Sequence, residues 1–303
     1  MAAPSYAGPF EKAWYYIFRV ICGLILLFLI LPIIVVIPLS FNKEPYFSFT
    51  QGMLHLDPEA FSLRWYRDIL VNGMMNPDAP FGLAWLKDSW NNAQWIHSMR
   101  NSFFIGFFAT IFATILGTLA ALGLSNPRMP WRNLVMSFLI SPMIVPIIIT
   151  AAGMYFFYSD VKLAQTYTGI ILAHTALGVP FVVITVTATL TGFDHSLTRA
   201  AANLGANPRT VFFRITMPLI LPGMISGALF AFVTSFDEVV AVLFLSGFGQ
   251  RTIPRQMWSG LREQISPTIL AVATILVIIS MLLLTTIELL RRRTERLRGL
   301  SPS

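Results

Sequence analysis

Long apolar runs alternate with short polar segments along this chain. A helix needs about 20 apolar residues to cross the roughly 30 Å hydrocarbon core of a bilayer. Backbone polar groups inside lipid must be paired within the segment, so spanning runs of this kind form helices. We therefore predict an all-α integral membrane protein with six transmembrane helices, at residues 17–41, 101–124, 134–158, 168–191, 218–246 and 268–290.

Proline within the third and fourth runs, at Pro142, Pro146 and Pro180, predicts kinks in these helices. The long polar segment 42–100 is rich in tryptophan and asparagine, and we expect it to form a structured extracytoplasmic cap. Positive charge marks the cytoplasmic side. With the N-terminus inside, the cytoplasmic segments carry eleven basic residues and the two short outer loops carry four. Both termini are therefore predicted to be cytoplasmic.

Composition agrees with a membrane location. Hydrophobic residues make up 55% of the 303-residue chain and charged residues 12%, whereas an ordinary globular domain carries about 25% charged residues. The net charge of +7 arises mostly at the ends of the runs, which favours a lipid bilayer as partner and argues against nucleic acid. Cys22 is the single cysteine, so no internal disulfide can form.

The second run carries small residues at every fourth position, at Ala109, Ala113, Gly117 and Ala121. Such a ridge lets another helix approach closely. The sequence leaves open whether the approaching helix belongs to this chain or to a partner subunit.

The segment 194–217 is the least apolar stretch between two runs and predicts two short helices with a tight corner. Asp194 can cap the first helix, Gly205 is suited to its C-terminal end, and Asn207 followed by Pro208 is suited to start the second. This pair could be a docking surface presented to a soluble partner or a plain interfacial amphipathic helix, and the residues leave these two alternatives equal.

The spacing within this segment resembles the signature of the permease subunits of binding-protein-dependent ABC importers. That signature reads Glu-Ala-Ala, three residues, Gly, nine residues, Ile, one residue, Leu-Pro. Here Ala200, Ala201, Gly205, Ile215 and Pro218 fall in register. Two positions depart from it, since Arg199 stands in place of glutamate and Met217 in place of leucine.

The resemblance implies a type I ABC importer permease fold in a bacterial cytoplasmic (inner) membrane. It also implies a second permease subunit, two ATPase subunits and an extracytoplasmic solute-binding protein as partners. The chain has no phosphate-binding loop, so we expect no enzymatic activity and no bound cofactor, ATP and Mg being used by the partner ATPase. The residues implied to couple to the ATPase are Arg199, Ala200, Ala201, Gly205, Ile215 and Pro218.

The fifth run contains two adjacent carboxylates, Asp237 and Glu238, which are costly in a membrane helix unless they face protein or water. With Phe232 and Phe236 they could pair a cation passing inward. The alternatives are that a carboxylate caps a helix break or pairs with an arginine of the following loop. Tyr155, in the aromatic end of the third run, is either a pathway residue or part of an interfacial aromatic belt.

The stretch SFDEVVAVLFLSG, residues 235–247, resembles the spermidine/putrescine type of these permeases. The resemblance implies import of a small cationic solute, a polyamine. An opine or an amino-acid-like substrate stays open, and so, more remotely, does a secondary transporter or a membrane scaffold. The sequence predicts no metal site. His174, in the fourth run, is favoured as a hydrogen-bonded residue inside the bundle over a pathway residue.

Overall fold

The computed structural model describes residues 8–126, 128–194, 196–263 and 266–297, and the regular elements in these ranges are helical. They fall into two compact units, Met1–Pro77 with Gly260–Ser303 and Asp78–Ser259. The all-α prediction is confirmed. Each unit is described by itself.

The first unit contains the first and last long helices and most of the polar segment that follows the first. Trp65 is buried and donates its indole N–H to the carbonyl of Asn42 at 2.6 Å, while Thr268 donates to the carboxylate of Asp68 at 2.6 Å. These bonds tie the polar segment to the ends of both long helices. The elements of this unit are α1 (Pro9–Leu39), α2 (Gln51–Leu54), the 3₁₀ helix η1 (Pro58–Ala60), α3 (Arg64–Val71) and α14 (Thr268–Leu297).

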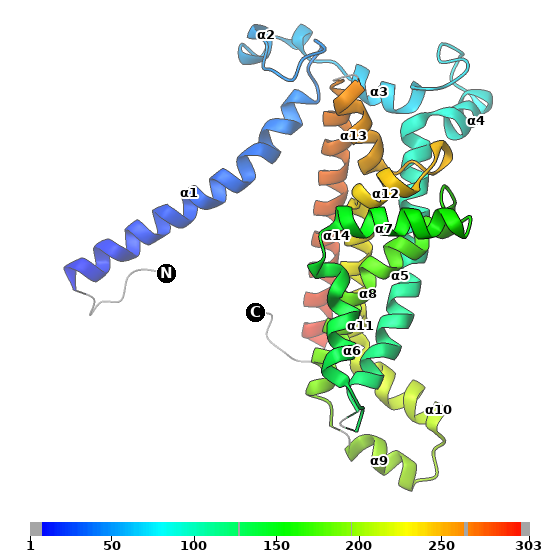
Figure 1. The fold of residues 1–303 in the computed structure, drawn as a ribbon. Coiled ribbons are helices and arrows are strands. Elements are labelled where there is room, and N and C mark those ends of the chain that lie inside the picture. The colour runs from blue at the N-terminus through cyan, green and yellow to red at the C-terminus, as the bar shows by residue number, and fades with distance from the viewer. Residues whose placement is uncertain (1–7, 127, 195, 264–265, 298–303) are drawn as a thin grey trace. The chain divides into compact units, whose positions relative to one another are not determined.

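The second unit contains a bundle of three long helices with shorter helices at both ends (Figure 1). The bundle consists of α5 (Gln94–Leu124), α8 (Tyr167–Thr191) and α11 (Met217–Asp237). The shorter elements are α4 (Leu83–Asn92), α6 (Arg132–Ile144), α7 (Ile147–Asp160), α9 (Ser196–Asn203), α10 (Pro208–Val211), the π-helical η2 (Phe212–Thr216), α12 (Val240–Leu245) and the 3₁₀ helix η3 (Phe248–Gln250). Helix α13 (Ile253–Glu263) follows and continues into the first unit.

The small-residue ridge of α5 is used within the chain. Ala109, Ala113 and Ala121 are at most 1% exposed, and a Cβ placed on Gly117 would lie 2.6 Å from the Cβ of Val182 on α8. Helix α8 therefore approaches α5 as closely as the ridge permits. Of the two alternatives left by the sequence, the intramolecular contact is confirmed.

The segment predicted as the third span is broken into two helices. Helices α6 and α7 meet at an angle of 101°. Val145 is extended and precedes Pro146, which leads into α7, because proline disfavours helical geometry in the residue before it. The kink predicted at Pro146 is thus a sharp turn, whereas Pro142 lies within α6 without ending it.

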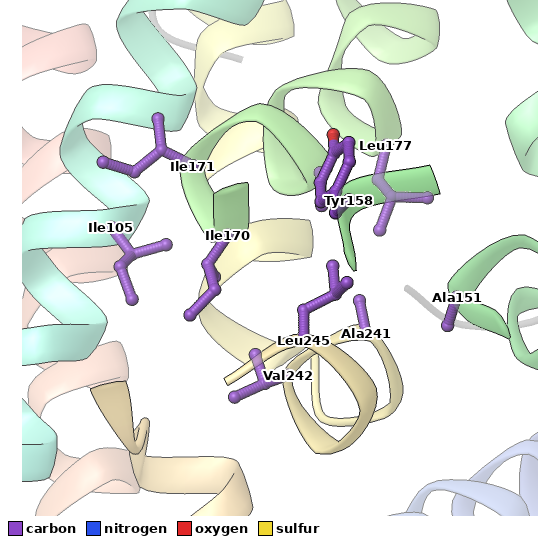
Figure 2. Close-up of a cluster of buried hydrophobic side chains, with 10 residues drawn as sticks. Ile105, Ala151, Tyr158, Ile170, Ile171, Leu177, Ala241, Val242 and Leu245 are labelled. Carbon is purple, nitrogen blue, oxygen red and sulfur yellow. The ribbon is translucent and has the colours of Figure 1, made fainter. Parts of the chain in front are cut away.

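Helix α7 is held by an apolar cluster at the α12 end of the bundle. Tyr158 of α7, Ile105 of α5, Ile170 of α8 and Leu245 of α12 are all buried in it. Figure 2 shows their side chains converging from these four helices. Burial of this cluster fixes α7 and α12 against the bundle.

Four helices of the described chain are long and apolar enough to span a membrane, and the bent α6–α7 pair makes a fifth if it counts as one span. The predicted sixth span, 268–290, falls on α14. Its apolar part with described side chains is Thr268–Leu282, and the side chains at 283–284 and 286–290 lie outside the described residues. The predicted fifth span, 218–246, is not one helix, because it ends at Asp237 and is followed by the separate α12.

Candidate functional site

A tight corner joins α9 to the helix that leads into the bundle. Gly205 has φ +83°, the left-handed region that glycine adopts without strain. Its N–H donates to Ala202 O, and the N–H of Ala206 donates to Ala201 O, both at 3.0 Å. This pair of bonds closes the helix as a Schellman motif. Asn207 then accepts the N–H of Thr210 at 2.8 Å and starts the next helix, as predicted.

The other end of α9 is capped by Asp194, whose carboxylate accepts the N–H of Ser196 at 2.8 Å. Between its two ends, α9 exposes Arg199 and Ala200, whereas Ala201 is only 9% exposed. Ala201 is thus buried within this chain, and its contact with the ATPase stays a prediction. Gly205 is exposed, and Arg199 makes no hydrogen bond or ion pair with the described residues around it.

The second helix of the predicted pair is not a separate helix. Residues Pro208–Asp237 form one continuous helical segment of 30 residues, with the π-helical turn η2 near its base. There the N–H of Met217 bonds to Phe212 O, five residues back, directly before Pro218. Proline has no N–H to offer and its ring clashes with the preceding turn, so the wider turn absorbs Pro218 without ending the helix. Ile215 is half-buried in this turn and Pro218 is exposed.

At the far end of α11, the two adjacent carboxylates have different environments. Glu238 is extended, and its Oε1 accepts the N–H of Ala241 at 2.9 Å, so it caps the first turn of α12. Asp237 is exposed and has no hydrogen-bond or ion-pair partner among the described residues. The capping alternative therefore holds for Glu238, and Asp237 is the carboxylate that remains open to a ligand.

Three aromatic rings gather near the end of α11 that carries Asp237. Phe232 and Phe236, one turn apart on α11, stack with centroids 5.6 Å apart, and Phe103 of α5 meets Phe236 edge-on at 5.2 Å. Phe103 is 44% exposed, so the group presents a surface. Tyr155 lies on α7, where its ring contact is with Phe156, and it does not join this group.

His174 is a buried residue of the bundle. Its Nδ1 shares a 2.7 Å hydrogen bond with the hydroxyl of Ser235 on α11, and Nε2 has no partner among the described residues. The interpretation of His174 as a hydrogen-bonded residue within the bundle is confirmed.

Sequence reasoning missed Phe103. Helix α5 carries several phenylalanines in its first turns, and nothing in their spacing singles out the one that meets α11. It also missed the polar loop 246–251 after α12, which side chains distant in sequence hold in place. Asn101 donates to Gly249 O at 3.0 Å and to Arg251 O at 2.9 Å, and the hydroxyl of Tyr167 donates to Gly249 O at 2.9 Å.

Comparison with known proteins identifies the family. Residues 113–296 match the family described as binding-protein-dependent transport system inner membrane component. The chain is 31% identical over 234 residues to the spermidine/putrescine transport system permease protein PotC of Haemophilus influenzae, covering 75% of this chain and 91% of that protein. It is 29% identical over 256 residues to the putrescine transport system permease protein PotI of Escherichia coli, covering 82% and 81%.

A solved structure supports the fold. The crystal structure of a bacterial ABC transporter involved in the import of the acidic polysaccharide alginate matches with a TM-score of 0.65 at 16% identity, covering 94% of this chain and 98% of the matched chain. At that identity the similarity concerns the fold, which is that of a type I importer permease. The family match covers more than half of the chain, and the helices have the apolar length of membrane spans. The chain is a multi-pass protein of the cytoplasmic membrane and belongs to the family of binding-protein-dependent transport system inner membrane components.

Proposed function

We propose that this chain is the membrane subunit of an ATP-driven importer that carries a polyamine, such as spermidine or putrescine, into the cytoplasm. An extracytoplasmic binding protein delivers the polyamine, and a second permease and two ATPase subunits complete the importer. The names of the similar PotC and PotI proteins support the substrate class. The observation that carries the proposal is the exposed Asp237 at the same end of α11 as the clustered rings of Phe103, Phe232 and Phe236.

This group has the chemistry that an alkylammonium ion requires. Aromatic faces attract ammonium groups by about 0.5–1 kcal/mol when exposed and by about 2 kcal/mol when desolvated. Asp237 adds a negative charge that no described cation neutralises. The apolar methylene stem of a polyamine can lie across the rings while an ammonium group pairs with the carboxylate. Two contacts of modest strength also suit a transport pathway, because the solute must leave as readily as it binds.

The continuous segment Pro208–Asp237 links this group to the ATPase side. At 1.5 Å per residue, its 30 residues extend over about 45 Å. One end carries the corner at Gly205, where α9 would receive the motion of the ATPase, and the other end carries Asp237. A helix without a break transmits a displacement of its base to its tip. Arg199 and Ala200 on the exposed side of α9 are the proposed contact with the ATPase, and an acidic group on the ATPase would complement Arg199.

The test is uptake of labelled spermidine and putrescine by proteoliposomes that contain the complete importer, with Asp237→Asn compared with the wild type. Loss of one exposed ion pair contributes up to about 1 kcal/mol, so we expect kcat/KM for uptake to fall about fivefold. Asp160→Asn, an exposed carboxylate at the end of α7, is the matched control and should leave uptake unchanged.

Unchanged uptake by Asp237→Asn, with a normal ratio of transport to ATP hydrolysis, would remove Asp237 from the pathway. Uptake of an amino-acid-like cation in place of either polyamine would overturn the substrate class and leave the importer assignment standing. Uptake that continues without ATP and without the ATPase subunits would show a secondary transporter instead.

A further inference from the structure

A small polar pocket is lined by residues at the start of α5. This end of the bundle lies opposite α9 (Figure 1). Its volume is about 220 Å³. Sites for drug-sized ligands have volumes of about 300–1,000 Å³, so this pocket fits a single side chain better than a whole solute. Its lining combines the end of α4 and the first turns of α5 with the loop after α12 and the start of α13. Among the lining residues are Gln94, His97, Ser98, Phe248, Arg251 and Gln256.

The loop that forms one wall is held by hydrogen bonds from both sides. Arg255 donates to Ser246 O at 2.8 Å and to Gly247 O at 3.0 Å, and also contacts the Ser246 hydroxyl. From the other side, Asn101 donates to the carbonyls of Gly249 and Arg251. The loop therefore presents its side chains from a fixed backbone, and little conformational entropy remains to be lost when a partner binds.

The charge in the pocket is positive and uncompensated. Among the described lining residues there is no aspartate or glutamate. Arg251 lies over the ring of Phe248 at 4.6 Å, and its hydrogen bond, to Gln256 Oε1, is long at 3.4 Å. Its Nε is buried without a partner. A guanidinium group has five donors in a planar fork, so most of those of Arg251 remain unused.

The neighbouring arginine strengthens this imbalance. Burial and the positive charge of Arg251 both lower the pKa of the Arg255 guanidinium, and the described residues include no carboxylate paired with either one. Two close guanidinium groups without an acid repel a cationic solute and attract an anion. The pocket is therefore distinct in chemistry from the Asp237 group, which is negative.

We infer that this pocket receives an acidic side chain of the solute-binding protein, with the carboxylate bound by Arg251 and by the amide of Gln256. The inference rests on the proposed function, since it names the docking contact of that importer. A planar fork binds a carboxylate through two parallel hydrogen bonds. Phe248 is 77% exposed beside the guanidinium, and an arginine next to an exposed aromatic ring has the composition of interface hot spots.

The pocket is better suited to a protein carboxylate than to a lipid headgroup. Sites for anionic lipids gather clusters of 4–8 lysines and arginines. Here Arg251 is the one lysine or arginine among the described lining residues, and Arg255 lies close by, so the positive groups are fewer than in such a cluster and suit a single carboxylate. The end of the bundle also agrees, because a binding protein must approach from the side opposite the ATPase, and α9 lies at the other end.

The experiment uses the complete importer in nanodiscs and the substrate-loaded binding protein of the same importer as the probe. The affinity of the two is measured directly by biolayer interferometry, and the half-maximal concentration for ATPase stimulation is measured in parallel. Arg251→Gln should weaken both about tenfold, which corresponds to about 1.4 kcal/mol. Arg262→Gln, an exposed arginine of α13, is the matched control and should change neither by more than about twofold.

Arg251→Lys keeps the charge but loses the fork, so it should recover part of the affinity. The wild-type affinity should also fall with added salt more steeply than that of Arg251→Gln. Salt dependence of the wild type serves as the test if Arg251→Gln fails to assemble, and its absence would overturn the inference.

Three further results are decisive. An affinity of Arg251→Gln equal to that of the wild type would overturn the docking contact. If Arg251→Gln loses affinity in nanodiscs with phosphatidylglycerol but not in neutral phosphatidylcholine, the pocket would be assigned to lipid, and the docking contact would be overturned as well. If the binding protein neither binds nor stimulates the wild-type importer, the proposed function itself fails, which is distinguishable from a defect confined to Arg251.

Discussion

Replacing Gly205 with alanine tests whether the corner after α9 must keep its left-handed backbone. A Cβ added at Gly205 would have no atom within 4 Å, so crowding costs nothing within this chain. The cost comes from φ, which is +83°. An L-residue with a side chain loses about 1–2 kcal/mol in this region relative to glycine. That corresponds to a factor of about 5–30 in the population of the corner.

This cost is comparable to the free energy that holds the corner. Two backbone hydrogen bonds close the end of α9, from Ala206 to Ala201 and from Gly205 to Ala202. Each contributes about 0.5–1.5 kcal/mol. Gly205→Ala should therefore loosen the corner without unfolding the bundle, and a loosened corner cannot push the base of the continuous helix.

The assay is solute uptake per ATP hydrolysed by the complete importer in proteoliposomes. We expect Gly205→Ala to lower this ratio about fivefold, with the melting temperature of the purified protein unchanged. Gly205→Asn is the matched variant, because asparagine tolerates the left-handed region far better than alanine does, and it should retain most of the coupling. A normal ratio for Gly205→Ala would refute the reasoning. Equal loss in both variants would point to side-chain bulk against the ATPase as the cause, and would refute the backbone argument.

Two other variants test the packing of α11. Gly227→Ala would place a Cβ 2.5 Å from a threonine hydroxyl of α8, so we expect the free energy of unfolding to fall by about 1–3 kcal/mol and the melting temperature to fall with it. In the control Gly123→Ala the added Cβ meets nothing within 4 Å, so this variant should not be destabilised. Equal melting temperatures of the two variants would contradict the close approach of the helices. Ser235→Ala removes the hydrogen bond to the buried ring of His174 and should lower the free energy of unfolding by about 1–3 kcal/mol, measured by thermal unfolding. The control Ser226→Ala changes an exposed serine and should leave the stability unchanged. Unchanged stability of Ser235→Ala would show that the hydrogen bond does not contribute.

The features that were predictable are those set by local chain chemistry. The corner at Gly205 and the start of a helix at Asn207 follow from which residues tolerate the required backbone angles and which can accept an orphan N–H. The turn at Pro146 follows from the steric restriction that proline places on the preceding residue, Val145. The approximate positions of α1, α5 and α8 follow from apolar length.

The features that were not predictable depend on contacts between distant segments. Pro218 indicates a boundary between two helices when only local rules are applied, but the π-helical turn keeps the segment continuous. The end of α11 at Asp237 has no glycine or proline to mark it, and depends on Glu238 capping α12. Asn101 contacts carbonyls 148 and 150 residues away, which no local pattern records.

The contacts between α8 and α11 differ between the two ends of the interface, and this difference bears on how α11 can move. Toward α9, Gly223 and Gly227 pack against Thr189 and Thr185, whose hydroxyls donate to carbonyls of their own helix. Sliding there breaks no interhelical hydrogen bond, so its cost is dispersion contact alone. Near Asp237, the buried bond between His174 and Ser235 joins the two helices. A displacement received at the corner is therefore expected to tilt α11 about this bond rather than shift it lengthwise. If so, Ser235→Ala should lower uptake per ATP hydrolysed as well as stability, whereas Gly227→Ala should act on stability first.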